Sequence, residues 1–495
     1  MRFRTRDVLI VLVPFAVSCG GEFPVEPPKN VTIQTVGWPS ELAVTDVRTL
    51  AVDLRRLPDS TRVTGLRVKW QSSDETVLRL VPLASRDSAE ATGRAGGEAV
   101  VSVLIEGGDA FEPETISATI RVTQKWVAVS AGRAHTCGIT VDSLAYCWGE
   151  GDAGKLGTGR PTASTIPAPV LGLGDLKFVA VSAGEESSCG IIREHVAYCW
   201  GSNAEGRLGN SDPSERSQFL PTVVSGPAFS SLDVGRVACG LGEDLIAFCW
   251  GANADDQLGH FGGQPPPLDP CLNNNPKGCS LTPRQVSPND TTPASYRRVS
   301  VGGHHVCGIS QAPDSLLAFC WGTGPFGALG NAAVTASPTP VPVAGGLRFL
   351  VIAAGGDHTC GIATSGATYC WGANTNGQLG NGALGDSGTP DAITPGAFDS
   401  LTAGGQHTCA LTSLGEASCW GLGSSGQLGN GLTIVQRTPV AVSNGLRFTA
   451  LSAGESHTCG VASDGSLYCW GQGTDGQLGT GDLANHTTPT RVAEP

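Results

Sequence analysis

The sequence of 495 residues has few charged and few aromatic side chains, and its only methionine is Met1. Charged residues make up 15% of the chain and aromatic residues 6%. Glycine, in contrast, contributes 69 residues, about twice its usual share. This composition favours a turn-rich β protein over a helical one. The chain is long enough for two or three domains, or for an array of repeats.

The chain also lacks a cluster of basic residues. Its 31 lysines and arginines are outnumbered by 44 aspartates and glutamates, which gives a formal net charge of −13. Nucleic-acid binding depends largely on clustered Lys and Arg side chains that neutralise phosphates. We therefore expect no nucleic-acid partner.

The apolar run at residues 8–17 is too short to span a membrane, which takes about 20 residues. It follows Arg2, Arg4 and Arg6 and precedes small residues, a pattern typical of a secretory signal peptide. The sequence therefore predicts a signal peptide at residues 1–18 and export of the remaining chain. No second apolar segment of spanning length follows it.

The cleavage site at residues 16–20, Ala-Val-Ser-Cys-Gly, resembles the lipobox of bacterial lipoproteins, with Ala16 where leucine is usual. The resemblance implies that Cys19 is lipidated and becomes the mature N-terminus. Ordinary cleavage, which leaves Cys19 as a free thiol, is the alternative. Residues 19–29 are rich in proline and predict an extended tether. We expect a protein held at the cell envelope or cell surface by this lipid anchor, its only contact with a membrane.

In residues 30–124, short apolar–polar alternations are separated by Pro, Gly and Asp turns, which predicts an antiparallel β-sandwich. The segments Val68–Glu75, with Trp70, and Gly97–Val103 resemble the Trp-Ser-Ser motif and the penultimate strand of bacterial Ig-like domains. The resemblance implies a spacer, with an adhesive module as the alternative. Because this segment has no cysteine, Trp70 and the β-branched core must stabilise it.

Residues 125–495 contain seven copies of one repeat. Each copy has a Cys-Trp-Gly triplet, and a Leu-Gly pair begins eight residues after the tryptophan. Successive tryptophans are 49 to 52 residues apart, except for an interval of 71 between the third and the fourth. The tryptophans are Trp148, Trp200, Trp250, Trp321, Trp371, Trp420 and Trp470. The leucines are Leu156, Leu208, Leu258, Leu329, Leu379, Leu428 and Leu478. Four short β runs per copy predict stacked four-stranded units.

This repeat resembles that of the regulator of chromosome condensation family, whose fold is a seven-bladed β-propeller. The last copy shows the motif in full, from Ser452-Ala453-Gly454 through Cys469-Trp470-Gly471 to Gly476–Gly479. The resemblance implies an all-β chain that closes into a ring. An open solenoid is the alternative, but seven copies without polar caps favour the ring. The tryptophan and the leucine of the motif are predicted to fill the space between neighbouring blades.

The chain has 17 cysteines, of which Cys19 stands alone and 16 lie beyond residue 136. Fourteen occur as two per repeat, ten residues apart in every copy but the fourth, where the separation is thirteen. Cysteines that flank a short turn would face each other on adjacent strands, and export favours their oxidation. The alternative is a metal site, but this spacing is not that of a zinc ribbon. The predicted disulfide pairs are Cys137/Cys147, Cys189/Cys199, Cys239/Cys249, Cys307/Cys320, Cys360/Cys370, Cys409/Cys419 and Cys459/Cys469.

The remaining two cysteines, Cys271 and Cys279, lie in a proline-rich insertion at about 261–293. A disulfide between them would make the insertion a compact projecting loop. Insertions on rigid scaffolds are often functional, and a passive decoration is equally consistent with the sequence.

Five histidines precede the first cysteine of their repeat by two residues, and Ser187 and Val237 take this position in repeats 2 and 3. A ring of imidazoles could bind a metal. A sevenfold ring is too wide for one ion, however, and the position also accepts Ser and Val. We therefore interpret each imidazole as hydrogen-bonded to a neighbouring blade and predict no metal site. The histidines are His135, His305, His358, His407 and His457.

The sequence contains no phosphate-binding loop, HExxH, GxSxG or EF-hand motif. It names no catalytic residue and no cofactor, although a catalytic pair assembled only in space would not be visible. We predict a non-catalytic scaffold that binds an envelope or extracellular protein through residues the sequence does not identify. The family resemblance implies guanine-nucleotide exchange as one alternative. The other is an envelope polysaccharide hydrolase or lyase, which carboxylates and aromatics at a channel mouth would favour.

Overall fold

The computed structural model describes residues 31–56, 67–85, 87–94, 96–106, 113–172, 176–259, 278–286, 295–311, 316–332, 336–394 and 397–495. The chain divides into two compact units, residues 1–124 with Glu494 and residues 125–493 with Pro495. The predicted signal peptide, Cys19, the tether and Cys271 lie outside the described residues. Within these ranges the helical segments are short 3-10 turns. They are Asp152–Gly154, Ala204–Gly206, Pro325–Gly327, Ala344–Gly346 and Ser443–Gly445.

The first unit consists of two four-stranded sheets with a shared apolar core. One sheet has the order β1 (Val31–Val36), β3 (Val47–Arg56), β6 (Ser88–Gly93), β5 (Leu78–Pro82). The other has the order β2 (Glu41–Ala43), β8 (Glu114–Thr123), β7 (Gly97–Glu106), β4 (Arg67–Ser72). Among the described strands of this unit, β2 and β8 are the one parallel pair, and the other pairs are antiparallel.

Alternate residues of these strands face the core of the first unit. In β7, Ala99, Val101, Val103 and Ile105 are buried and alternate with more exposed neighbours, the period of two that a half-buried strand requires. They pack with buried residues from both sheets. The two layers therefore form a sandwich.

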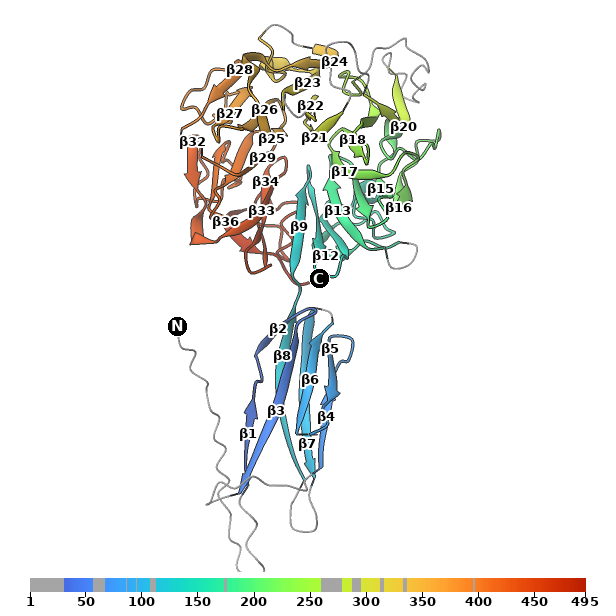
Figure 1. Ribbon diagram of the computed structural model, residues 1–495, viewed down its shortest axis with the longest axis vertical. Helices are drawn as coiled ribbons and strands as arrows, with labels where there is room; N and C mark the ends of the chain where they lie inside the picture. Colours follow the sequence, from blue (N-terminus) through green and yellow to red (C-terminus); the bar gives the residue numbers. More distant parts are fainter. Residues whose placement is uncertain are drawn as a thin grey trace, which may run out of the picture. The chain divides into compact units, whose positions relative to one another are not determined.

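The second unit consists of seven four-stranded antiparallel sheets arranged about a common centre (Figure 1). Blade 1 comprises β9 (Trp126–Ala131), β10 (His135–Thr140), β11 (Ala145–Gly149) and β12 (Ser164–Pro169). Blade 2 comprises β13 (Phe178–Ala183), β14 (Ser187–Ile192), β15 (Ala197–Gly201) and β16 (Gln218–Val223). Blade 3 comprises β17 (Phe229–Val234), β18 (Val237–Gly242), β19 (Ala247–Ala252) and β20 (Cys279–Gln285). Blade 4 comprises β21 (Tyr296–Val301), β22 (His305–Ser310), β23 (Ala318–Thr323) and β24 (Ala336–Pro342).

The last three blades repeat the same order of strands. Blade 5 comprises β25 (Phe349–Ala354), β26 (His358–Ala363), β27 (Thr368–Gly372) and β28 (Ser387–Ala392). Blade 6 comprises β29 (Ser400–Ala403), β30 (His407–Leu411), β31 (Ala417–Gly421) and β32 (Gln436–Ala441). Blade 7 comprises β33 (Phe448–Ala453), β34 (His457–Ala462), β35 (Leu467–Gly471) and β36 (His486–Arg491).

Blade 7 packs against blade 1, so the array is a closed ring and not an open solenoid. The first strand of blade 1, β9, contacts β33 and β34. In addition, the indole N–H of Trp148 donates to the carbonyl of Gln477 at 3.0 Å, across the boundary between the two blades. Each blade uses four consecutive strands. Non-covalent contacts therefore close the ring, without exchange of a strand between the first and last blades.

The apolar cores of the propeller lie between blades, as the sequence predicts. In the core between blades 1 and 2, Cys137, Cys147 and Leu156 of blade 1 pack against Phe178 and Trp200 of blade 2. All seven motif tryptophans are completely buried. Because neighbouring blades share each core, neither blade has a complete core by itself.

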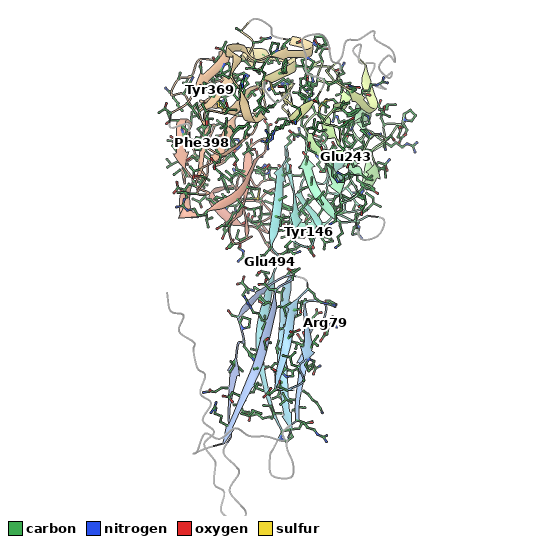
Figure 2. The ribbon with its side chains drawn as sticks, viewed as in Figure 1. Arg79, Tyr146, Glu243, Tyr369, Phe398 and Glu494 are labelled. Atoms are coloured by element: carbon green, nitrogen blue, oxygen red, sulfur yellow. A yellow bond between two sulfur atoms is a disulfide. The ribbon has the colours of Figure 1, made fainter. Side chains whose placement is uncertain are left out.

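Each motif tryptophan also contacts an aromatic ring near the start of its own blade, which the sequence interpretation did not single out. The ring centroids are 5.6 to 6.0 Å apart, a distance at which aromatic pairs stabilise beyond their buried area. In blade 6 this ring is Phe398, labelled in Figure 2. The aromatic residues are Trp126, Phe178, Phe229, Tyr296, Phe349, Phe398 and Phe448.

Candidate functional site at the propeller axis

Seven disulfides lie inside the blades, one in each, and link the second strand to the third. In every case the two cysteines are direct partners in the strand register. Their Cα atoms are 4.0 to 4.1 Å apart, the short spacing typical of a non-hydrogen-bonded pair. Cys279 is also disulfide-bonded, and its predicted partner Cys271 lies outside the described residues. The bonded pairs are Cys137–Cys147, Cys189–Cys199, Cys239–Cys249, Cys307–Cys320, Cys360–Cys370, Cys409–Cys419 and Cys459–Cys469.

The five histidines lie at the boundaries between blades, and each hydrogen-bonds a hydroxyl of the next blade. The distance from Nε2 to the hydroxyl oxygen is 2.7 to 2.9 Å, and both side chains of each pair are completely buried. The interpretation of these histidines as links between blades is therefore confirmed. The pairs are His135–Ser188, His305–Thr359, His358–Thr408, His407–Thr458 and His457–Thr136.

The partners of these hydroxyls determine the protonation of the histidines. Each hydroxyl donates its single hydrogen to a backbone carbonyl of the histidine's own blade, at 2.8 to 3.0 Å. It must then accept from the imidazole, so Nε2 of each histidine carries a hydrogen. Among the described residues, no group hydrogen-bonds the buried Nδ1 atoms.

Burial keeps these imidazoles neutral. It lowers the pKa of His305, His358 and His407 to about 3 and that of His457 to about 4. The pKa of His135 also lies well below its usual value, because of burial and the nearby Lys155 charge. The ring of histidines therefore carries no charge at neutral pH, and each Nε2 is already engaged with its neighbour.

The same carbonyl also accepts the indole N–H of the next blade's tryptophan. This bond is present at all seven boundaries, at 2.9 to 3.1 Å. The carbonyl belongs to the residue before the motif leucine, which is Gln in four repeats and Lys155, Arg207 or Ala328 in the others. Because the bond uses the backbone, the side chain at this position is free to vary.

Seven glycines, one from each blade, form a ring at one mouth of the central channel. Hydrogen bonds link the glycines of neighbouring blades at six of the seven boundaries. At each of these, the residue that follows the glycine donates its backbone N–H to the carbonyl of the corresponding glycine in the next blade, at 3.0 to 3.3 Å. There is no room for a side chain: a Cβ on Gly404 would lie 2.3 Å from the carbonyl oxygen of Gly454. The glycines are Gly132, Gly184, Gly235, Gly302, Gly355, Gly404 and Gly454.

The residues that follow the glycine ring make this mouth asymmetric. Four of them, in blades 7, 1, 2 and 3, are charged, whereas those in blades 4, 5 and 6 are a second set of glycines that leave the backbone bare. The charged residues are Glu455, Arg133, Glu185 and Arg236. The glycines are Gly303, Gly356 and Gly405.

Ion pairs surround the charged side of the mouth, and carboxylates exceed cations. The completely buried ammonium of Lys155 lies 2.6 Å from Glu150 and 3.1 Å from Glu186 of the next blade. Arg133 lies 2.9 Å from Glu186. Burial and the charge of Glu185 raise the pKa of Glu455. The mouth is therefore an acidic surface in which most cations are already paired.

Further pairs extend this acidic surface around the mouth. Arg236 lies 3.6 Å from Glu185 and 3.5 Å from Asp255. His304 lies 3.0 Å from Asp357 of the next blade. Two of these pairs, Arg236–Glu185 and His304–Asp357, join consecutive blades, whereas Arg236 and Asp255 belong to the same blade.

A polar cavity of about 510 Å³ lies along the axis next to the glycine ring, lined by the first strands of the blades. Six of the seven blades have, in or beside this cavity, a side-chain oxygen that accepts a backbone N–H of the next blade, at 2.8 to 3.1 Å. Ala353 takes the position in blade 5. The six residues, named here the axial oxygen ring, are Ser130, Ser182, Asp233, Ser300, Thr402 and Ser452.

Asp233 is the single carboxylate in the axial oxygen ring. It accepts from the N–H groups of Val301 at 2.8 Å and Val234 at 3.1 Å, and burial raises its pKa. Sequence reasoning did not identify it. The sequence does carry a signal, because Leu232-Asp233-Val234 is the only first-strand end among the seven repeats with a charged residue where the others have Ser, Thr or Ala.

Seven four-stranded blades around a polar axis define a β-propeller. The regulator of chromosome condensation (RCC1) repeat matches more than half of the chain, at residues 142–191, 194–242, 317–362, 365–411, 415–461 and 464–495. A second description of the same repeat matches residues 126–155, 351–378, 398–427 and 448–477. The chain belongs to this repeat family.

Curated relatives share the repeat but differ in length. Human E3 ubiquitin-protein ligase HERC2 is 30% identical over 171 residues, which are 32% of this chain and 4% of HERC2. The ultraviolet-B receptor UVR8 of Arabidopsis thaliana is 28% identical over 249 residues, 50% of this chain and 53% of the receptor. The chain therefore spans about half or less of these relatives.

Solved structures show the same fold. Human WBSCR16 superposes with a TM-score of 0.61 at 20% identity, over 71% of this chain and 94% of that one. Prp20p of Saccharomyces cerevisiae also gives 0.61 at 20% identity, over 72% of this chain and 87% of its own. At this identity the likeness establishes the propeller fold alone.

Proposed function

We propose that this protein is a non-catalytic propeller that binds an envelope or extracellular protein through the acidic mouth formed by the glycine ring. The observation that supports this proposal is the asymmetry of that mouth. Charged side chains of blades 7, 1, 2 and 3 lie opposite the bare glycine backbone of blades 4, 5 and 6. Backbone hydrogen bonds between blades hold both halves. A prearranged surface of this kind binds with little loss of conformational entropy.

The charge of the mouth favours a basic segment of the partner. Glu455, Glu185, Glu186 and Asp357 supply carboxylates from three blades, 7, 2 and 5, and charge complementarity selects partners and speeds association. Prp20p, which has the same fold, is a protein that binds Gsp1p and histones. Protein partners are thus consistent with this fold.

Export and attachment at the bacterial envelope are part of the proposal. Seven disulfides fit an exported protein, because cytosolic thiols are kept reduced. Among the described residues, no helix is long and apolar enough to cross a membrane. The signal at residues 1–18 and lipidation of Cys19 would hold the protein at the envelope. The first unit would act as an Ig-like spacer, in which Trp70 packs against Trp38 with centroids 5.7 Å apart.

The two alternatives have less support. The axial cavity is lined mainly by Ser, Thr, Ala, Val and Leu side chains, and its described lining contains no aromatic residue, which counts against a polysaccharide hydrolase or lyase. Nucleotide exchange would require a small GTPase, a cytosolic partner that an exported protein would not meet.

The test is crosslinking in cells followed by affinity capture and mass spectrometry. Three forms of the mature protein would be compared: the native chain, the double variant E185K/E455K and the control E243K. Glu243 is exposed in the turn between β18 and β19, at the end of blade 3 away from the mouth. We expect one envelope protein with the native chain and with E243K, and its loss with the double variant. Equal capture by all three forms, or no specific partner, would refute binding through the mouth.

A further inference from the structure

The axial cavity contains unused hydrogen-bond donors. The oxygens of Ser130, Thr402 and Ser452 each accept a backbone N–H at 2.9 to 3.1 Å. A hydroxyl also has one hydrogen to donate, and among the described residues no acceptor takes the hydrogens of these three. All three line the cavity. They belong to blades 1, 6 and 7, so neutral donors lie together on one side of the axis.

Blade 4 places two cations in the lining of the same cavity. Arg297 and Arg298 are exposed and belong to the first strand of that blade. Within the described ranges, no carboxylate lies within ion-pair distance of either guanidinium. At the level of Arg298 the other first strands carry Ala, Ser or Val. The charge therefore belongs to one blade and is not a feature of the repeat.

The order of the blades separates the cations from the neutral donors. In a ring of seven, blade 4 lies across the axis from blades 7 and 1. A molecule that contacts both sides needs an anionic group at one end and neutral oxygens at the other. The cavity of about 510 Å³ falls within the range of small-molecule sites.

Asp233 does not neutralise the arginines. Its carboxylate hydrogen-bonds the N–H groups of Val234 and Val301 and the hydroxyls of Ser182 and Ser300. The guanidinium groups therefore remain available to a ligand, and the donors around Asp233 stabilise its charge.

We infer that the axial cavity binds an acidic sugar, with its carboxylate or phosphate on Arg298 and Arg297 and its neutral oxygens on the hydroxyls of Ser130, Thr402 and Ser452. Guanidinium groups pair with carboxylate or phosphate through charge-assisted hydrogen bonds. Hydroxyl donors suit the hydroxyl and ring oxygens of a sugar. The site adjoins the mouth proposed to bind protein, but it uses different polar side chains.

Isothermal titration calorimetry of the mature full chain tests this inference. The probes are D-glucuronate, D-glucose 6-phosphate, neutral D-glucose and inorganic phosphate. We expect one of the two acidic sugars to bind, and glucose and phosphate each to bind at least tenfold more weakly. The stronger acidic sugar identifies the anionic group as a carboxylate or a phosphate. No binding of either acidic sugar, or equal binding of glucose or phosphate, would overturn the inference.

Variants locate the site. R298A should weaken binding of the acidic sugar at least tenfold, whereas R193A, at an exposed arginine outside the cavity, should leave it unchanged. S452A should weaken binding several-fold with the fold retained, because blade 5 has Ala353 at the same position. Circular dichroism would verify the folding of each variant. Unchanged affinity in both R298A and S452A would place the ligand elsewhere and refute the assignment.

Discussion

Nε2 of His407 in blade 6 lies 2.9 Å from the hydroxyl oxygen of Thr458 in blade 7. The hydroxyl in turn donates to the carbonyl of Gln427 in blade 6, also at 2.9 Å. Four other boundaries repeat this relay. The remaining two boundaries lack both the histidine and the hydroxyl. Ser187 takes the histidine position of blade 2 and Ala238 the hydroxyl position of blade 3. At the next boundary, Val237 and Val306 take these two positions. Histidine and hydroxyl therefore occur as a pair or not at all.

Stability should fall as the pH drops below about 6.5, the ordinary pKa of histidine. The folded-state pKa of His407 is lowered to about 3 by burial, so the unfolded chain binds the proton first. The stabilising effect of the neutral imidazole is fully present above pH 6.5 and is lost as the pH falls toward 3. Each such histidine should reduce the free energy of unfolding by about 1.4 kcal/mol per pH unit in this window. Urea unfolding between pH 7 and pH 5 measures the slope.

The double variant H407V/T458V tests the origin of that slope. It reproduces the Val237 and Val306 pair of blades 3 and 4 and should remove about one proton from the uptake that accompanies unfolding. H195N is the control, because it removes a histidine that is about half exposed in the folded chain. If the double variant kept the native slope, His407 would not be a source of the acid sensitivity.

Trp250 should tolerate replacement by phenylalanine less well than Trp420. The carbonyl of Gln378 accepts from both Trp420 and Thr408, so W420F leaves it one donor. The carbonyl of Arg207 accepts from Trp250. Ala238 takes the position that Thr408 has in blade 6, so no hydroxyl donates to the Arg207 carbonyl from that position. An unsatisfied buried carbonyl costs roughly 1 to 3 kcal/mol. Denaturant unfolding should show W250F to be the less stable variant by about that amount.

Removing the second donor in blade 6 supplies the matched comparison. W420F combined with T408V should lose more stability than the sum of the two single variants, because only the pair leaves the Gln378 carbonyl unsatisfied. Additive losses, together with equal costs for W250F and W420F, would contradict the shared role of the carbonyl.

A methyl group on the glycine ring should disrupt the propeller more than one on the outer strands. In G404A the new Cβ would lie 2.3 Å from the carbonyl oxygen of Gly454, a rigid backbone atom of the next blade. In the control G388A the nearest atom is Cα of Ala332 at 3.7 Å, an ordinary contact. We expect G404A to melt well below the native protein and G388A within about 2 °C of it. Similar melting temperatures for the two variants would show that the ring can expand.

The spacing of residues was enough to predict the propeller and the positions of its packing residues. Trp420 and Leu428 recur at fixed intervals because every blade boundary needs the same large side chains. The bonds at the axis were not predictable in the same way. The acceptor for Trp420 is a backbone carbonyl, which no residue type marks, and Lys155 is buried against Glu186 from another repeat. Asp233 and Arg298 differ from the repeat, and only the closed ring shows that both line one cavity.

Replacing one blade disulfide should cost a similar amount in any blade. The loop closed by Cys409 and Cys419 is worth roughly 3 kcal/mol in the chain-entropy model, and the longer loop of Cys307 and Cys320 should differ by only about 0.2 kcal/mol. Denaturant unfolding of C409A/C419A and C307A/C320A measures both losses. Because all four sulfurs are completely buried, a thiol reductant should not affect the native protein until it unfolds. Rapid reduction under native conditions, or a difference above 2 kcal/mol between the variants, would show that local packing sets the contribution of each bond.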